Sequence, residues 1–208
     1  MKQIVIPGEI VSEERKRLGS NVYVQNGKIH SKVLGIIDNE SDTADVVALK
    51  GTYVPKRDDT VIGIVNRVVF AGYGVEINSF NESFIPRKAM RQEAKLGDII
   101  VAKIDDVNEL KEANLSYPKK LYDGEIIEII PVRSPRLIGK NASMLDVLTN
   151  GTNCEIFIGK NGRVWAKDGN IDLLKKAINF IDENSYKSNL TNAVEELLKG
   201  EKKWLCKI

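Results

Sequence analysis

A chain of 208 residues with 42% hydrophobic and 29% charged side chains has an ordinary globular composition, sufficient for one domain or two to three small ones. No run approaches the roughly 18 apolar residues of a membrane span, and residues 1–10 lack the apolar core of a secretory signal. Two cysteines make neither a disulfide framework nor a zinc site. We therefore expect a cytoplasmic protein with no membrane partner, metal or cofactor.

The formal net charge of +2 hides an uneven distribution of charge along the chain. Residues 129–167 carry six basic and two acidic side chains, whereas residues 56–128 carry eleven basic and thirteen acidic ones. A local excess of positive charge is the electrostatic footprint of a polyanion partner such as a nucleic acid. Charge alone leaves a second reading open, which is a solvated basic face without any ligand.

Residues 1–55 are predicted to form a small all-β domain, because polar and apolar residues alternate there without a helical period. Strands are expected at Asn21–Gln25, Ile29–Ile37 and Ala44–Leu49. Between the first two lies Asn26-Gly27, a dipeptide typical of tight hairpins.

Residues 56–128 are predicted to form a five-stranded closed barrel of the oligonucleotide-binding type, with glycines at its bends. The five expected strands cover residues 60–70, 75–78, 83–86, 99–104 and 124–130. Residues 105–118 are polar and are predicted to form a loop.

Residues 129–200 change to a helical period and are predicted to form a compact α+β module. Its strand-like runs are residues 131–137 and the two arms of a hairpin, 155–158 and 163–166. Helices are expected at residues 142–148, 172–181 and 190–199, with Ser143 as the cap of the first. Residues 201–208 are left as a C-terminal tail.

The tetrapeptide Ile-Gly-Lys-Asn occurs twice, at Ile138–Asn141 and at Ile158–Asn161. A Gly-Lys-Asn turn lets backbone N–H groups and a cation approach an anion closely, because glycine tolerates dihedrals that other residues resist. The first copy precedes a predicted helix N-terminus, which favours a phosphate. The second is a hairpin tip, where Asn161-Gly162 is expected to serve the backbone by adopting positive φ.

These motifs carry a resemblance to known modules. The segment Pro135–Met144, which opens the third domain, resembles the start of a KH domain, and the preceding barrel resembles an S1 domain. Ile158–Trp165 contains a Gly-x-Asn-Gly signature. Together with Pro7-Gly8-Glu9, the pattern covers nearly the whole chain and resembles the RNA-binding cap subunit of the archaeal exosome, of the ribosomal-RNA-processing-four type.

The resemblance implies a non-catalytic subunit that caps a hexameric ring of RNase-PH-like exosome subunits. Three cap positions would be filled by copies of this chain or by the zinc-ribbon cap subunit. The cap would bind single-stranded RNA, favouring A-rich sequences, and guide 3′ ends into the pore for 3′-to-5′ degradation. Residues 1–55 would dock on the ring, and catalysis would belong to the ring.

Site residues follow from the same resemblance and from local charge. The expected RNA contacts are Phe70, Tyr73, Arg87, Lys88, Arg91, Arg133, Arg136, Lys140 and Asn141. A structural role, packing the KH module against the barrel, is expected for Gly159, Lys160, Asn161 and Gly162. No catalytic residue and no metal ligand is expected.

Two departures from the family pattern affect these expectations. The Gly-x-x-Gly phosphate clamp of KH domains reads Gly139-Lys140-Asn141-Ala142 here, so its fourth glycine is missing. The S1 aromatic pair is reduced to Tyr73, with Phe70 nearby.

Two alternative functions stay open at this point. One is an S1/KH transcription antitermination or translation factor, which would carry two KH modules where one fits here. The other is a stand-alone nuclease using acidic doublets such as Asp58-Asp59, although adjacent side chains on a strand point to opposite faces.

Overall fold

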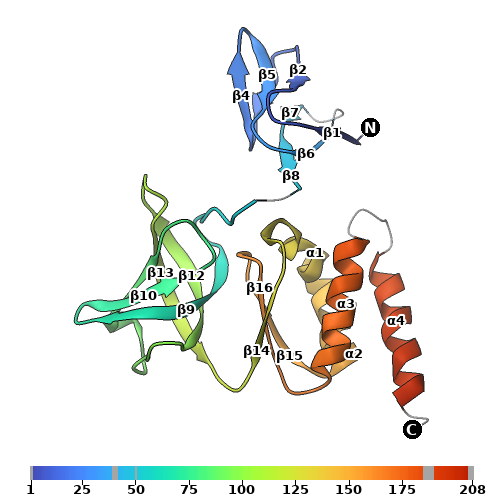
Figure 1. The fold of residues 1–208 in the computed structure, drawn as a ribbon. Helices are drawn as coiled ribbons and strands as arrows, with labels where there is room; N and C mark the ends of the chain where they lie inside the picture. Colours follow the sequence, from blue (N-terminus) through green and yellow to red (C-terminus); the bar gives the residue numbers. More distant parts are fainter. Residues whose placement is uncertain (1, 39–41, 50, 185–189, 206–208) are drawn as a thin grey trace. The chain divides into compact units, whose positions relative to one another are not determined.

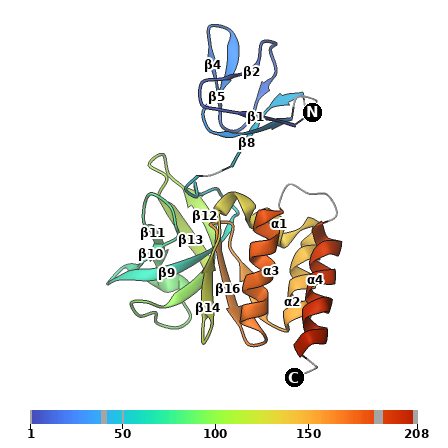
Figure 2. The same cartoon turned by 45° about the vertical axis from the view of Figure 1, so that its right-hand side comes forward.

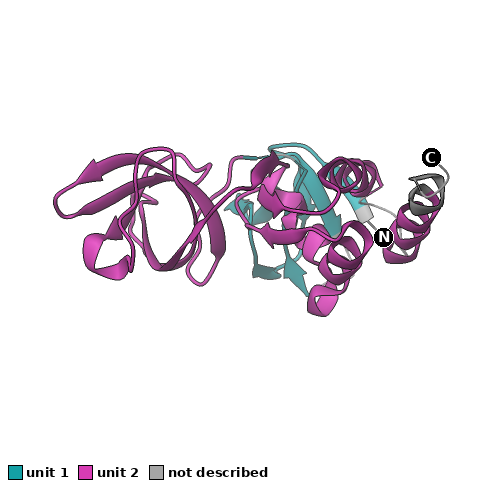
Figure 3. Cartoon of the chain, turned by 90° about the horizontal axis from the view of Figure 1, so that it is seen from below, with its two compact units in different colours: residues 1–51 teal, residues 52–208 magenta. Residues whose placement is uncertain are grey.

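The computed structural model describes residues 2–38, 42–49, 51–184 and 190–205. The chain divides into two compact units, residues 1–51 and residues 52–208, which Figure 3 draws in teal and magenta. Each unit has its own hydrophobic core.

The first unit is built of short strands. They are β1 (Lys2–Val5), β2 (Ile10–Ser12), β3 (Arg17–Leu18), β4 (Val22–Gln25), β5 (Lys28–Ser31), β6 (Gly35–Asp38), β7 (Thr43–Ala44) and β8 (Val46–Ala48). They form two three-stranded antiparallel sheets, β1-β6-β8 and β2-β5-β4, and the parallel pair β3-β7. The core of this unit comprises Val5, Val22, Ile29, Ile37, Ala44 and Val46.

The predicted hairpin at Asn26-Gly27 is confirmed, because both residues have positive φ and the strands pair up to Gln25 opposite Lys28. The single strand predicted at Ile29–Ile37 is wrong. Ser31 turns the chain there: its hydroxyl donates to Val33 O at 2.6 Å and accepts from Val33 N at 3.2 Å. A buried serine that bonds to the backbone two residues on interrupts a strand.

The second unit begins with a closed five-stranded barrel, visible to the left of Figure 1. Its strands are β9 (Thr60–Val69), β10 (Gly72–Glu76), β11 (Ser83–Pro86), β12 (Ile99–Val107) and β13 (Ala113–Leu121). Their order around the barrel is β10-β11-β13-β12-β9, and the parallel contact of β11 with β13 closes it. The predicted barrel class is confirmed.

The strand that closes the barrel is not the predicted one. β13 lies largely in the segment expected to be a loop, whereas Glu125–Glu128 (β14) belongs to the sheet of the following module. Only Ala113, Leu115 and Leu121 of β13 are buried, and polar residues occupy most of the remaining positions. A strand with one solvated face and so few apolar residues is hard to tell from a loop by its sequence.

The C-terminal module is an antiparallel sheet covered by helices. Its sheet order is β14-β16-β15, with β15 at Glu155–Ile158 and β16 at Arg163–Lys167. The helices are α1 (Ser134–Ile138), α2 (Ser143–Thr152), α3 (Ile171–Glu183) and α4 (Leu190–Leu205). Figure 2 shows the helices on one side of this sheet and the barrel on the other.

Three details of this module differ from the predictions. The run at residues 131–137 is helical, forming η2 (Pro131–Arg133) and α1, because proline is well tolerated in a first helical turn. Ser143 is the first residue of α2, and Ala142 takes the capping position. Finally, α4 continues to Leu205, so the expected tail is helical there, and residues 206–208 lie outside the described residues.

Candidate nucleic-acid interface

The second Ile-Gly-Lys-Asn copy is inserted into the wall of the barrel. Asn161 is fully buried, and its side-chain amide accepts from Ile62 N at 3.1 Å and donates to Ile62 O at 2.7 Å. The same amide nitrogen donates to Ile77 O at 3.0 Å. Since β10 pairs with β9 only as far as Glu76 opposite Ile64, the Asn161 carboxamide continues the ladder in place of a strand.

Charged side chains around Asn161 bind the same two strands. Lys160 donates its backbone N–H to Thr60 O at 2.9 Å and its ammonium to Asp59 Oδ1 at 2.7 Å. Arg163 donates to Glu76 O at 2.9 Å and pairs with the Glu76 carboxylate. The second copy is therefore tied to the barrel by backbone, amide and ionic contacts.

Asp59 also connects the segment that precedes the barrel to this contact, because Tyr53 Oη donates to Asp59 Oδ2 at 2.6 Å. Burial first, and then the hydrogen bond to Asp59, raises the pKa of Tyr53 far above its ordinary value. The phenol therefore stays protonated and remains a donor at all physiological pH values. One carboxylate thus holds Tyr53, at the start of the second unit, and Lys160, in the KH-like module.

The tip of the β15–β16 hairpin depends on glycine at two positions. Gly162 has φ +81°, and a Cβ there would lie 2.5 Å from Ile129 O. A Cβ on Gly159 would lie 2.2 Å from Asn161 Oδ1. The expected positive φ at Asn161 itself is wrong, since only Gly162 adopts it. The amide side chain, not the backbone conformation, explains the asparagine.

Trp165 fills the space between the barrel and the KH-like sheet. It is 2% exposed and clusters with Ile62 and Leu121 of the barrel. Its ring lies so close to Gly124 that a Cβ on that residue would be 2.3 Å from the indole. The residues around Asn161 and Trp165 therefore form a packed junction, with the Lys160 side chain at its solvent-exposed edge.

The first copy has the opposite character and is exposed to solvent. Lys140 and Asn141 are exposed, and Gly139, Asn141 and Ala142 have φ values of +75°, +52° and +62°. No side chain caps the N-terminus of α2. The Ser143 N–H donates to Lys140 O, so the loop presents to an anion the Lys140 ammonium and the positive end of the α2 dipole.

Ala142 occupies the place of the missing fourth glycine, and the loop still adopts the left-handed conformation that a glycine would favour. For a residue with a Cβ this conformation costs about 1–2 kcal/mol. The alanine therefore takes a positive φ that a glycine would adopt without strain, and it adds a methyl group to the loop.

The two arginines expected beside this loop differ in their contacts. Arg136 is exposed on α1. Arg133 donates to Asp182 O at 3.0 Å and pairs with the Asp182 carboxylate, which fixes η2 to the end of α3. An anion near Arg133 would have to compete with that carboxylate.

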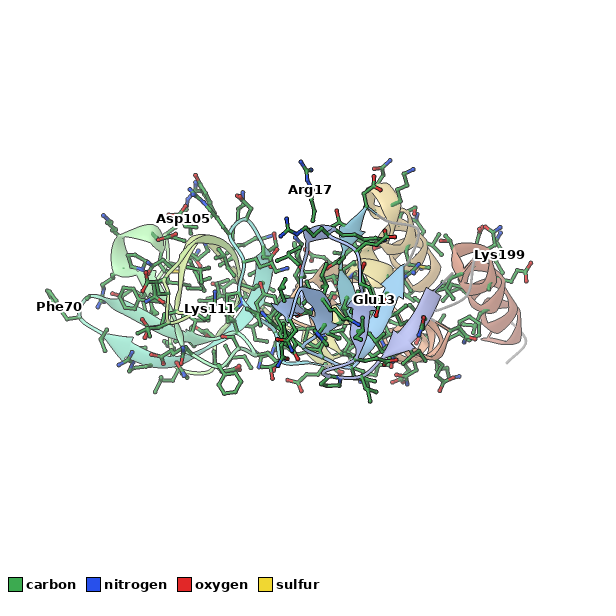
Figure 4. The ribbon with its side chains drawn as sticks, turned by 90° about the horizontal axis from the view of Figure 1, so that it is seen from above. Glu13, Arg17, Phe70, Asp105, Lys111 and Lys199 are labelled. Atoms are coloured by element: carbon green, nitrogen blue, oxygen red, sulfur yellow. The ribbon has the colours of Figure 1, made fainter. Side chains whose placement is uncertain are left out.

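In the barrel, Phe70 and Tyr73 prove to be in opposite environments. Phe70 is 96% exposed in the β9–β10 turn and projects from the end of the barrel in Figure 4. Tyr73 is 1% exposed within the barrel core. The expectation of base stacking on Tyr73 is therefore wrong, because its ring has no free face.

The basic cluster expected next to the barrel lies around η1 (Arg87–Ala89). Arg87, Lys88 and Arg91 are all exposed, and Arg87 pairs with Glu93. Sequence reasoning placed these residues at the surface, but it missed Phe80 and Tyr117, which are 91% and 84% exposed.

The described residues hold no group of three or more histidine, cysteine, aspartate or glutamate side chains that could bind a metal ion. Among the helices in the described part of the chain, none is long and apolar enough to cross a membrane.

Two family models match the chain. One is described as the exosome RNA binding protein RRP4 N-terminal domain and matches residues 2–50. The other is described as a KH domain and matches residues 124–172. The second match starts one residue before β14, in agreement with the place of that strand in the C-terminal sheet.

Curated relatives match over nearly the full chain. The exosome complex component Rrp4 of Methanosarcina barkeri is 38% identical over 97% of this chain and 83% of its own length. Its counterpart in Methanothermus fervidus is 33% identical over 95% of both chains. A crystal structure described as a "putative exosome complex RNA-binding protein" is 30% identical, with a TM-score of 0.65, and covers 74% of this chain and 98% of that one.

The same isosteric change in the two tetrapeptides tests their different roles. Asn161→Asp replaces a buried donor by an oxygen that faces Ile62 O and Ile77 O, so we expect a loss of about 3 kcal/mol or more in unfolding free energy. Asn141→Asp, at an exposed position, should change it by less than about 0.5 kcal/mol. Urea denaturation measures both, and equal losses would contradict the assignment.

Restoring the fourth glycine of the clamp should stabilise the protein. Ala142→Gly removes the cost of φ +62°, and after the larger chain entropy of glycine we expect a gain of up to about 1 kcal/mol. The control Ala193→Gly, inside α4, should instead cost about 1 kcal/mol. A lower melting temperature for Ala142→Gly would show that the loop conformation is misassigned.

Proposed function

Because the chain belongs to the Rrp4 family of exosome complex components, we propose that it is a non-catalytic RNA-binding cap subunit of the exosome. The observation that supports this most directly is the contrast between its two Ile-Gly-Lys-Asn copies. In one copy Asn161 is buried as a structural contact, and the other copy presents an exposed lysine and asparagine beside the start of α2.

RNA capture by the KH-like module would rest on phosphate contacts. Lys140 and Asn141 directly precede α2, where the helix dipole favours an anion, and Arg136 is exposed on the preceding helix α1. Arg133 would act mainly by holding η2 in place through Asp182. Phosphate contacts carry no sequence information, so this module would bind RNA without strong sequence preference.

The barrel would add a second contact of a different kind. Phe70 offers a fully exposed ring to a base, and Arg87, Lys88 and Arg91 supply positive charge on η1 and just beyond it. Arg87 is held by Glu93, so Lys88 and Arg91 are the more available cations. Any preference for A-rich RNA would arise on such a stacking surface, since adenine stacks well on aromatic rings.

In the assembled complex, residues 1–51 would dock on the hexameric ring of RNase-PH-like subunits. Three cap positions, filled by this chain or by the zinc-ribbon cap subunit, would surround the entrance. Individual contacts with exposed charges are weak and sensitive to salt, and several copies would raise the affinity by avidity. The 3′ end would then be passed to the ring for degradation.

The experiment is to measure RNA binding by the cap assembled with its ring subunits. Arg136→Ala/Lys140→Ala should weaken filter retention of single-stranded RNA. It should also lower the salt dependence of log affinity by about 1.4 for each copy that engages the RNA, from the loss of two phosphate contacts per copy. The control Lys175→Ala/Lys199→Ala removes the same charge from α3 and α4 and should leave both quantities unchanged.

Two outcomes would contradict the proposed function. One is unchanged RNA retention by the Arg136→Ala/Lys140→Ala variant at low salt. The other is degradation of labelled poly(A) by the purified chain alone, with magnesium and phosphate present, which would make it a nuclease.

A further inference from the structure

Tyr117 is an exposed aromatic residue in a strained backbone conformation. Its φ is +49° and its side chain is 84% exposed. In the strand register, Val101 of β12 lies opposite Lys119 of β13, and Lys103 lies opposite Ser116. β13 therefore has one more residue than β12 between these two pairs and forms a β-bulge. Bulges re-aim side chains, and positive φ in a bulky residue is costly. Glycine or asparagine would form this bulge at lower cost, so the bulge itself does not explain the tyrosine.

The side chains around Tyr117 lie on the outer wall of the barrel, next to the KH-like sheet. Lys103 is exposed between the inward-facing Ala102 and Ile104, and therefore points outward. The pKa of Lys103 is raised mainly by its hydrogen bond to Asp58 and, to a lesser extent, by the nearby Tyr117 phenol. Tyr117 and Lys103 are therefore neighbours on this wall.

Lys119 extends this surface to the KH-like module. Its ammonium lies 4.9 Å from the centroid of the Phe157 ring, on the edge strand β15. Phe157 is only partly buried. Within the described residues no carboxylate pairs with Lys119, so its exposed ammonium keeps its full charge beside the ring face. We call Lys103, Tyr117, Lys119 and Phe157 the junction surface.

The composition of the junction surface indicates its ligand. The surface combines two aromatic rings with two cations. Proteins that bind single-stranded nucleic acid have such a combination, in which bases stack on the rings and phosphates bind the cations. Lys103 is shared with Asp58, at 2.7 Å, whereas Lys119 is open to a phosphate. A protein-binding surface would be expected to have a larger apolar area and no unpaired cation at its centre.

We infer that the junction surface is a second single-stranded RNA contact, in which a base stacks on Tyr117 and the adjacent phosphate binds Lys119. It rests on the proposed RNA-binding function but uses none of the residues assigned to it above. Because barrel and KH-like residues both contribute, the contact exists only while the Asn161 turn holds the two together. A bound RNA strand would then contact barrel and KH-like residues together, as one continuous surface.

The test uses the full chain and a fluorescein-labelled oligo(U) or oligo(A) RNA, with anisotropy at low salt. Tyr117→Gly removes the ring and also relieves the positive φ, so the fold should be at least as stable as the parent. Its RNA affinity should fall by about five- to 150-fold, the usual effect of losing one stacked base. Tyr117→Trp should retain the affinity, and Lys119→Ala should lower the salt dependence by about 0.7.

Controls match each change by residue type. Phe80→Ala removes another almost fully exposed ring, and Lys199→Ala removes a cation on α4, which Figure 4 shows at the end of the unit opposite Phe70. Neither should alter RNA affinity. Oligonucleotides carrying 5-iodouridine should photo-crosslink to Tyr117 or Phe157, as identified by mass spectrometry of the digest.

Three results would overturn the inference, and they have different meanings. If the wild-type chain binds no RNA, the proposed function falls with it. If Arg136→Ala/Lys140→Ala weakens binding while Tyr117→Gly does not, and crosslinks lie elsewhere, only the junction surface is refuted. If Tyr117→Gly leaves RNA affinity intact but prevents co-purification with the ring subunits, this surface docks a protein.

Discussion

The buried carboxamide of Asn161 is the interaction on which the second unit depends. It pairs with both backbone groups of Ile62 and with Ile77 O, at a point where β10 no longer pairs with β9. A side chain of another type would leave those buried groups unsatisfied, at a cost of about 1–3 kcal/mol for each. Lys160 and Arg163, on either side, add contacts to Asp59 and Glu76. The barrel and the KH-like module are consequently one packed body with a shared outer surface.

The same four residues, Ile-Gly-Lys-Asn, serve two purposes because their surroundings differ. At the β15–β16 tip the asparagine is surrounded by unpaired strand groups, and the lysine meets a carboxylate. At the start of α2 both side chains face solvent, and the helix N–H groups lack a cap. Binding to RNA requires free donors, and domain packing requires satisfied ones. A sequence motif therefore indicates which groups are present, while burial decides whether a ligand can use them.

Much of the fold follows from the sequence, and the failures have physical causes. Strong periodicity identified α2, α3 and α4 and four of the barrel strands. β13 was missed because its outward face is polar and contains Pro118. Tyr73 was expected to contact RNA because it is the aromatic left in place of the S1 pair, but its ring is buried in the barrel core. Gly72 beside it serves close packing, since a Cβ there would lie 2.1 Å from Ile85 O. The exposed Tyr117 lay within the missed strand, so no sequence signal could separate it from a loop residue.

Native-state hydrogen exchange at Ile62 and Lys160 tests the central claim most directly. Their amides donate across the barrel–KH contact, to Asn161 Oδ1 and to Thr60 O. If the two modules form one cooperative body, both amides should exchange only through global unfolding, with the same free energy as the barrel amide of Val65, which donates to Asp98 O. Exchange of Ile62 and Lys160 at a clearly lower free energy than Val65 would show that the modules separate locally, and would contradict this account.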